Sequence, residues 1–391
     1  MTIKVSRRGK IPPFIVMDVL RAANQRQAEG KDVLNLELGQ PATSAPARVI
    51  EAAHEMLDKD LLGYTEAFGM MSVRKRISEY YNKLNDISID PARIIITTGS
   101  SGGFVLAFMA AFDVGDRVAI SDPGYPGCRN ILLGLGIEPV LVQTSAETKF
   151  QPTPELLDQI DGKIDGLIVA SPSNPTGAML DETELRALSD YCCERKVRLI
   201  SDEIYHGITY GKPGVSALLF DENSIVINSF SKYFSMTGWR VGWMVVPSDL
   251  HRSVECLAQN FFISAPTLSQ FGAGAAFDCI DELDRNVARY ATNRKILLKE
   301  LPKAGFDQLA PVDGAFYVYA DVSSFTNDSE NFCRRMLEDT GVATTPGTDF
   351  DEARGNAFIR FSFSGPTGSV SEAADRIKNW VARASNEKPI V

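Results

Sequence analysis

The sequence is poor in the residues that bind metals or cross-link a chain. Its 391 residues include only six cysteines and three histidines. No two cysteines form a C-x-x-C pair, and His54, His206 and His251 lie far apart. This spacing matches none of the common zinc motifs. We therefore predict no metal site, and we expect reduced thiols of the kind usual in cytoplasmic proteins.

Long apolar runs and a surplus of positive charge are also missing. No stretch approaches the roughly 20 apolar residues that a membrane helix needs. Met1–Lys10 is not followed by the apolar segment of a secretory signal. The net charge is −10, so no excess of lysine and arginine is available to neutralise nucleic-acid phosphates. We expect a cytoplasmic protein that binds neither membranes nor nucleic acids.

Apolar runs of strand length alternate with helical patterns in the middle of the chain. This alternation is typical of a mostly parallel sheet covered by helices on both faces. A helix is expected at Asp181–Lys196, where Asp181 and Glu184 form a capping box. The predicted strands are Arg93–Thr98, Arg117–Ser121, Gly166–Ser171, Arg198–Glu203, Ser224–Ser229 and Val241–Val246.

The two ends of the chain differ from this pattern. We predict an α/β fold with a large domain at residues 46–285 and a smaller α+β domain at residues 286–391. The N-terminal segment, residues 1–45, is expected to contribute to the small domain, and Met1–Gly39 is expected to be irregular. Predicted C-terminal elements are a helix at Asp284–Lys303, strands around Phe316–Asp321 and Phe358–Ser364, and a last helix that begins at Ser369.

Ligands of parallel α/β sheets bind beyond the carboxyl ends of the strands, and the first two loops there are polar. Thr98–Gly103 combines glycines and hydroxyls at the start of a helix, which favours an anion such as phosphate. A tight strand-to-helix turn would have the same composition. In Ser171–Gly177, two prolines fix the backbone around Asn174, whose amide can then face a ligand. The alternative is an ordinary proline-rich turn.

The next two loops carry charges at the ends of apolar strands. Asp202 closes one strand, and a buried carboxylate needs a cation or a donor. A structural salt bridge would also satisfy it. Lys232 follows another strand among hydroxyls and aromatics, where loss of water favours the neutral amine needed for Schiff-base chemistry. A solvated surface lysine is the alternative. Arg240, eight residues later, can fork onto a phosphate.

Together, these four loops resemble the class I/II aminotransferases, the fold type I pyridoxal-phosphate family related to aspartate aminotransferase. The motifs that carry the likeness are Asn174–Gly177, Asp202–Tyr205 and Ser231–Arg240. The likeness extends from Gly39-Gln40-Pro41 to Arg360. It implies an aminotransferase that uses pyridoxal 5'-phosphate and moves an amino group between an L-amino acid and a 2-oxo acid by a ping-pong mechanism.

The resemblance also implies roles for matching residues. Lys232 would hold the cofactor as a Schiff base and shuttle the proton, with Asp202 paired to the ring nitrogen and Tyr205 to the ring oxygen. Arg360 would bind the substrate carboxylate, with Asn174 and Gly39 also at the substrate. The other implied cofactor contacts are Asn174 at the ring oxygen, Tyr125 stacked on the ring, Ser100, Ser101, Ser229 and Arg240 at the phosphate, and Tyr64 at the phosphate of the partner subunit. Tyr64 would make the active unit a homodimer.

The choice of substrate stays open at this point. Ser100–Phe104 contains no lysine or arginine, which argues against an enzyme restricted to aspartate and glutamate. An aromatic or apolar donor, with 2-oxoglutarate or pyruvate as acceptor, is an equally good expectation. Arg21, Arg26 and Arg129 could supply a second cation, but we expect ordinary surface residues at these positions.

Other functions on the same scaffold also stay open. The same lysine serves carbon–sulfur β-lyases and cyclopropane-forming synthases. A non-catalytic cofactor-binding regulator is a further alternative, but only about 40 residues precede the large domain, too few for a DNA-binding domain and its linker. A purely structural protein would not need Asn174, Asp202, Lys232 and Arg360 together.

Overall fold

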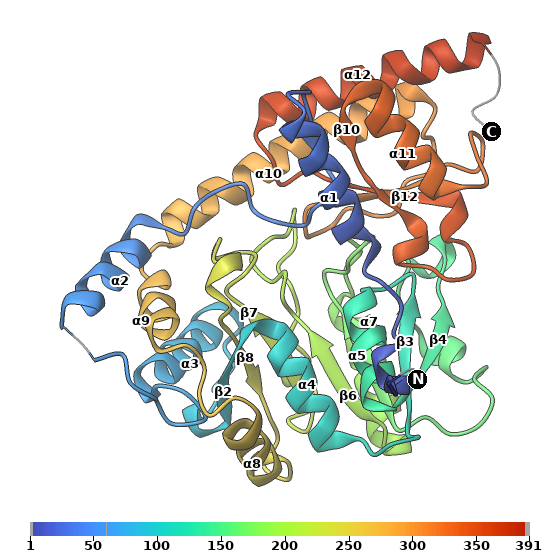
Figure 1. Cartoon of the computed structure of the whole chain (residues 1–391). Helices are drawn as coiled ribbons and strands as arrows, with labels where there is room; N and C mark the ends of the chain where they lie inside the picture. The colour runs from blue at the N-terminus through green and yellow to red at the C-terminus, as the bar shows by residue number, and fades with distance from the viewer. Residues whose placement is uncertain (1–2, 60, 388–391) are drawn as a thin grey trace.

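The larger sheet is mostly parallel. The computed structural model describes residues 3–59 and 61–387, and in this part of the chain seven strands form that sheet. β3 to β7 run parallel, while β8 is antiparallel to both of its neighbours. In spatial order the strands are β2 (Ile94–Thr97), β8 (Gly242–Val245), β7 (Ile225–Ser229), β6 (Arg198–Asp202), β5 (Gly166–Ala170), β3 (Arg117–Asp122) and β4 (Glu138–Gln143) (Figure 1). The predicted sheet is confirmed; the edge strand β4 was not predicted.

Apolar side chains bury both faces of this sheet. In β7, Ile225 and Ile227 pack into the hydrophobic cluster on one face, and Val226 packs into the cluster on the other. The alternation follows from the two-residue period of a strand. Helices α4 (Gly99–Ala111), α5 (Pro126–Leu135) and α8 (His251–Phe261) cover one face, and α3 (Met71–Asn85), α7 (Glu182–Arg195) and α9 (Thr267–Ala276) the other. Two more helices complete this part: α2 (Ala47–Lys59), which packs on α9, and the short α6 (Pro154–Leu157).

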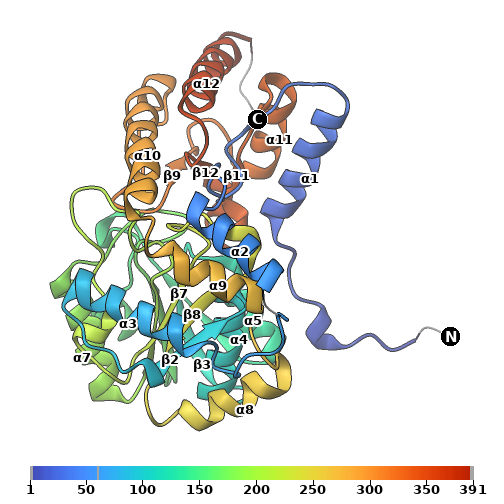
Figure 2. The ribbon, with the colours of Figure 1, turned by 90° about the vertical axis from the view of Figure 1, so that its left-hand side faces the viewer.

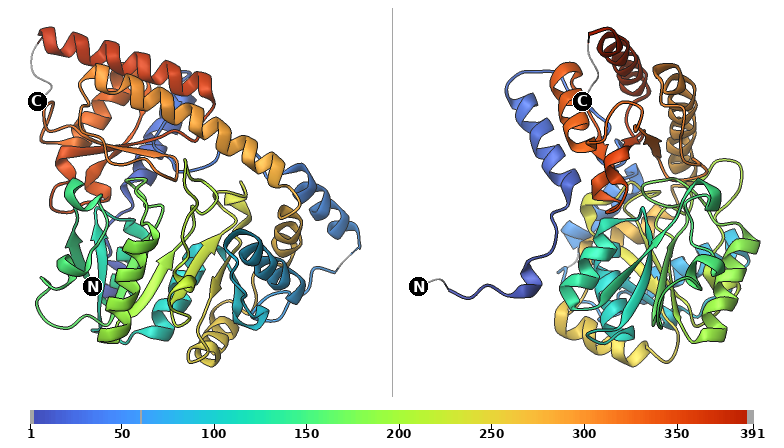
Figure 3. Two further views of the ribbon diagram at one scale, coloured as in Figure 1. Left: turned by 180° about the vertical axis from the view of Figure 1, so that it is seen from behind. Right: turned by 90° about the vertical axis from the view of Figure 1, so that its right-hand side faces the viewer.

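A second layer lies at the carboxyl edge of the large sheet (Figure 3). Its antiparallel sheet consists of β11 (Thr345–Pro346), β12 (Phe358–Ser362) and β9 (Tyr317–Asp321), and β1 (Leu34–Asn35) pairs with β10 (Val342–Ala343). The helices beside them are α1 (Ile15–Ala28), α10 (Ile280–Glu300), α11 (Ser329–Thr340) and α12 (Thr367–Glu387). The division into a large and a small domain stays a prediction, since α10 spans the boundary expected at residue 285.

The prediction that Met1–Gly39 is irregular was wrong for part of this segment. Residues 15–28 form helix α1, and a short 3-10 helix, Arg7–Gly9, precedes it in an exposed stretch beside α5 (Figure 2). Only Val16 and Ala23 are buried in this helix. Its apolar stripe is therefore too narrow to stand out in the sequence, which explains the wrong prediction.

The predicted start was right for one helix and wrong for another. Asp181 and Glu184 form the predicted reciprocal capping box at the start of α7, and Cys192 is buried while Cys193 is exposed. By contrast, α12 begins at Thr367, so Ser369 lies inside its first turn.

Within the described part of the chain, every helix falls short of the length or the apolar character that crossing a bilayer demands.

Candidate active site

A cavity lies at the carboxyl ends of β5, β6 and β7. It is walled by residues of the large sheet's loops, of the small sheet and of α1. Ten of the predicted site residues line it: Gly39, Ser100, Ser101, Tyr125, Asn174, Asp202, Tyr205, Lys232, Arg240 and Arg360. The topology explains the convergence, because parallel strands bring the residues after each of them to one edge.

Lys232 lies in this cavity with a single hydrogen bond from its amine. Nζ donates to the carbonyl of Gly39 at 2.6 Å. Burial lowers the pKa of Lys232 to about 8, and the positive charges of Arg360 and Arg240 add to this effect. At pH 7 roughly a tenth of the amine is therefore neutral, far more than for an ordinary lysine, and the neutral form is the one that acts as a nucleophile or a base.

Asp202 is the last residue of β6, and its side chain is buried. Its Oδ1 accepts the N–H of Ile204 at 3.2 Å. Burial raises the pKa of Asp202 to about 7, and the charge of Glu203 adds to the rise. An ionised carboxylate in this position requires a cationic neighbour, so Asp202 suits a ligand that brings a protonated nitrogen.

The start of α4 and Arg240 together suit an anion. Thr98, the residue before α4, makes no capping bond with its side chain, so the first N–H groups of the helix stay available. The guanidinium of Arg240 lies close over Gly99, since a Cβ added at Gly99 would come within 2.5 Å of Nη2. Gly99 also has φ +66°, a conformation that favours glycine. Ser100 and Ser101 follow on the cavity wall.

Arg360 is held in place, but two of its five N–H groups, that of Nε and one of Nη1, have no partner among the described residues. Nη1 donates to Oδ1 of Asn174 at 2.8 Å, and Nη2 donates to the carbonyl of Glu37 and to the hydroxyl of Thr345. The guanidinium also packs over the ring of Tyr317 at 4.4 Å. Its buried Nε has no hydrogen-bond partner among the described residues. A carboxylate entering the cavity would satisfy that donor.

Two predicted residues lie off the cavity wall, and several wall residues were not predicted. Ser229 is buried, and its hydroxyl donates to the hydroxyl of Ser231 at 2.9 Å. Ser231 lines the cavity. Tyr64 is 82 % exposed. Tyr317 is one of the wall residues that were not predicted, and its hydroxyl is hydrogen-bonded to the hydroxyl of Tyr205 at 2.6 Å. The others include Ser231 and Thr237, and Phe14, Val16 and Met17 from the start of α1.

The three arginines considered for a second cation differ in their surroundings. Arg21 is exposed and pairs with Asp18, whereas Arg26 is half-buried and donates to the carbonyls of Asp32 and Glu338. Arg129 is not a surface residue, contrary to our expectation, because it is buried and pairs with Glu352 at 3.0 Å. α5 carries it inward toward the loop before β12. None of the three lines the cavity.

Glu37 is the least satisfied carboxylate beside this site. It is fully buried, and neither carboxylate oxygen has a hydrogen-bond partner within residues 3–59 and 61–387. Burial raises the pKa of Glu37 to about 7, although the charge of Arg360 opposes the rise. A carboxyl group whose pKa is higher in the folded state binds its proton more tightly there. The folded state therefore loses stability as pH rises from about 4.5 to 7 and stays less stable above 7.

We expect Glu37→Gln to stabilise the protein at pH 8. The neutral amide avoids burying a charge, and the gain at that pH is on the order of 2–3 kcal/mol. Thermal unfolding should show a higher melting temperature at pH 8 and a much smaller difference at pH 5. Glu147→Gln, at an exposed position, is the matched control. An unchanged or lower melting temperature at pH 8 would contradict the expectation.

Comparison with known proteins decides the family. A family model described as aminotransferase class I and II matches residues 31–377. The chain belongs to this family. The predicted aminotransferase is thus confirmed at the level of the reaction class, and the resemblance noted in the sequence is confirmed with it.

Individual relatives of this aminotransferase match over nearly their whole lengths. A valine–pyruvate aminotransferase from Mycobacterium tuberculosis is 51% identical, with 97% of this chain and 99% of the relative covered. A (5-formylfuran-3-yl)methyl phosphate transaminase from Methanocaldococcus jannaschii is 35% identical over 94% of this chain and 96% of the relative. The crystal structure of an aminotransferase from Mycobacterium tuberculosis superposes with a TM-score of 0.96 at 50% identity, covering 98% of this chain and 100% of the other.

Proposed function

We propose that this aminotransferase uses pyridoxal 5'-phosphate to move the amino group of an apolar L-amino acid, of the size of valine, to pyruvate. Amino acid and 2-oxo acid would use the same cavity in turn, in a ping-pong sequence. The name of the relative that is 51% identical, a valine–pyruvate aminotransferase, supports this choice of substrates.

The distribution of charge on the cavity wall carries the proposal. Its only cations among the described residues are Lys232, Arg240 and Arg360, and each has a proposed role for the amine, the phosphate or the α-carboxylate. A second carboxylate, as in aspartate, would find no cation of its own. The remaining wall is largely apolar, with Phe14, Val16, Met17, Leu38 and Ile204. Such a wall favours an aliphatic side chain.

The residues present fit the cofactor. The free helix start, Ser100, Ser101 and Arg240 suit its phosphate, and the close approach of Arg240 to Gly99 leaves a cradle that only glycine permits. We propose that Asp202 faces the ring nitrogen, that Tyr125 stacks on the ring, and that Asn174 and Tyr205 face its oxygen. Ser229 would act through Ser231, to which it is bonded. When bound, the cofactor supplies an electrophilic carbon and a ring that stabilises negative charge.

The chain's own residues then divide the remaining work. Arg360 binds the substrate carboxylate with its free Nε and fixes the orientation of Cα. Lys232, in its neutral form, takes the proton from Cα and later returns it. Apolar residues of α1 cover the cavity and exclude water.

The visible absorption spectrum of the protein tests this proposal. Pyridoxal phosphate added to the protein should produce a band that bleaches when valine is added without an acceptor and returns with pyruvate. Aspartate should bleach it far less. A band that persists with every apolar donor would contradict the choice of donor. Release of pyruvate and ammonia from cysteine-type substrates would favour β-lyase chemistry, and a bound cofactor without any reaction would favour a regulator.

We also propose that the active unit is a cytoplasmic homodimer. Support for a dimer comes from the exposure of large apolar side chains near Tyr64, notably Leu61 at 101 % and Tyr64 itself at 82 %, which is the expected state of residues that reach a partner. The six unpaired cysteines suit a reducing compartment. Sedimentation should show a dimer, and a fully active monomer would contradict the role of Tyr64.

A further inference from the structure

Helix α1 is largely exposed, but its N-terminal end, with the buried Val16, forms part of the cavity wall. Phe14, Val16 and Met17 line the cavity, and the ring of Phe14 meets that of Tyr125 edge-on at 5.9 Å. Farther along, Ala23 packs with Leu337 and Ala343 beside the small sheet. Because only Val16 and Ala23 are buried among the residues of α1, hydrophobic packing alone fixes the helix weakly.

A carboxylate from the other end of the chain fixes that end of α1. Phe14, the residue before the helix, makes no capping bond with its side chain. Instead, the N–H groups of Ile15 and Val16 donate to Oδ1 and Oδ2 of Asp349, at 2.9 and 3.2 Å. Asp349 is fully buried. It therefore acts as the cap of α1, and its negative charge lies at the positive end of the helix dipole.

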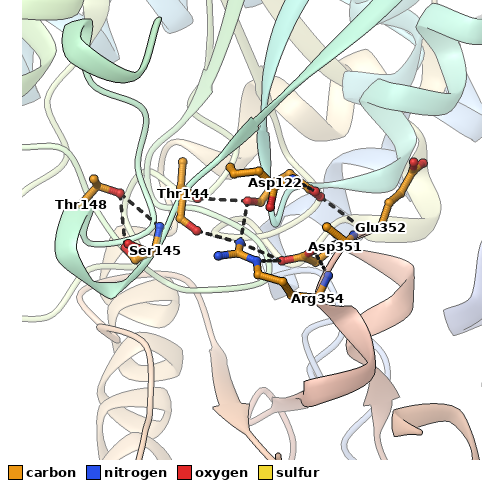
Figure 4. A network of polar contacts seen from close by, with 9 residues as sticks. Asp122, Thr144, Ser145, Thr148, Asp351, Glu352 and Arg354 are labelled. Carbon is orange, nitrogen blue, oxygen red and sulfur yellow. Dashed lines mark hydrogen bonds and ion pairs between the residues drawn. The ribbon is translucent and has the colours of Figure 1, made fainter. Parts of the chain in front are cut away.

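The loop that carries Asp349 is in turn fastened to the large sheet. Figure 4 shows Arg354 bonded to Asp351 and to the carbonyls of Asp122 and Thr144, at 3.0 and 2.7 Å. Asp122 is the last residue of β3, and Thr144 directly follows β4. Arg129 of α5 adds its ion pair with Glu352. These contacts fix the position of Asp349, and with it the start of α1, relative to the large sheet and its candidate catalytic loops.

We propose that Asp349 is a positioning residue that sets the apolar pocket for the substrate side chain. By holding Ile15 and Val16, it places Val16 and Met17 at the depth that a valine-sized side chain fills. Loss of the cap lets the wall withdraw, so a branched side chain loses contact, whereas the methyl group of alanine has little contact to lose. This inference rests on the proposed function and extends it to a residue that does not touch the substrate.

The test compares two donors in Asp349→Asn. The amide keeps the shape of the side chain but replaces one acceptor by a donor, so one of the two bonds to α1 is lost. We expect the ratio of kcat/KM for valine to that for alanine to fall about tenfold, mainly through KM. Asp328→Asn is the matched control, because Asp328 caps α11 within its own segment. It should leave the ratio unchanged. An unchanged ratio in Asp349→Asn would overturn the proposal.

A second variant and a second readout keep the inference separate from folding and from the proposed function. Ile15→Pro removes the N–H that donates to Asp349, together with the isoleucine side chain, which lies outside the cavity wall, and the first helical position tolerates proline well. It should lower the ratio in the same direction. Amide hydrogen exchange of Val16–Val19 should be at least about tenfold faster in Asp349→Asn than in Asp328→Asn. Wild-type protein that turns over neither donor would contradict the proposed substrates, whereas equal exchange in the two variants would contradict Asp349 alone.

Discussion

Lys232→Ala should fold normally and lose turnover almost completely. Among the residues that the structure describes, Lys232 carries the one amine on the cavity wall, so the variant removes both the proposed attachment of the cofactor and the base that moves the Cα proton. A positioned general base alone is worth about 10²–10⁴-fold, and loss of covalent attachment adds to this, so kcat should fall by at least about 10⁴-fold. Steady-state assays with valine and pyruvate measure the loss.

The control for this variant is Lys196→Ala, at an exposed position, which should keep full activity. The melting temperature of Lys232→Ala should stay close to that of the wild type, because the Lys232 amine makes only one hydrogen bond, to Gly39. Turnover within tenfold of the wild type would remove Lys232 from the mechanism. It would also leave the lowered pKa of this lysine without a functional reason.

Arg360→Gln should raise KM for the amino acid and for the 2-oxo acid together. Both substrates carry the α-carboxylate that we assign to Arg360. Removing one partner of a buried, hydrogen-bonded charge pair costs about 2–5 kcal/mol, which corresponds to roughly 30- to 4000-fold in kcat/KM. Separate measurement of KM for valine and for pyruvate shows whether both rise.

The affinity for pyridoxal phosphate separates this effect from a general disturbance of the site. It should change little in Arg360→Gln, because the residues proposed for the phosphate lie at the start of α4 and at Arg240. Arg334→Gln removes an exposed arginine that pairs with Glu338 along α11 and serves as control. An increase in KM for one substrate only would contradict a shared carboxylate site.

The sequence places the residues that follow buried strands at one edge, and these residues do line one cavity, because both signals are local in the sequence; their roles in the reaction stay predictions. The apolar run of β6 precedes Asp202, and that of β7 precedes Lys232, so the strand and its functional residue are found together. Parallel pairing then brings the two to one edge, as a general rule of this architecture. The prediction thus needed no knowledge of distant contacts.

Contacts between distant segments were not predicted, since no local pattern encodes them. Tyr317 reaches Tyr205 across 112 positions, and its strand β9 gives no hint of that pairing. The start of α1 has no capping side chain of its own, because Asp349 supplies it from 334 positions away. A search for Ser, Thr, Asp or Asn before an apolar stripe could not have found this helix start.

The hydrogen bond between Lys232 and the carbonyl of Gly39 links a chemical state to a backbone position. Any reaction that consumes the hydrogens of Nζ releases that carbonyl and loosens the segment around Gly39. Free-energy linkage is reciprocal. A ligand that prefers this segment when it is held against Lys232 must therefore lower the equilibrium constant for modification of the lysine by the same factor by which the modification lowers the affinity for that ligand. The position of the Gly39 backbone therefore depends on whether the amine of Lys232 is unmodified.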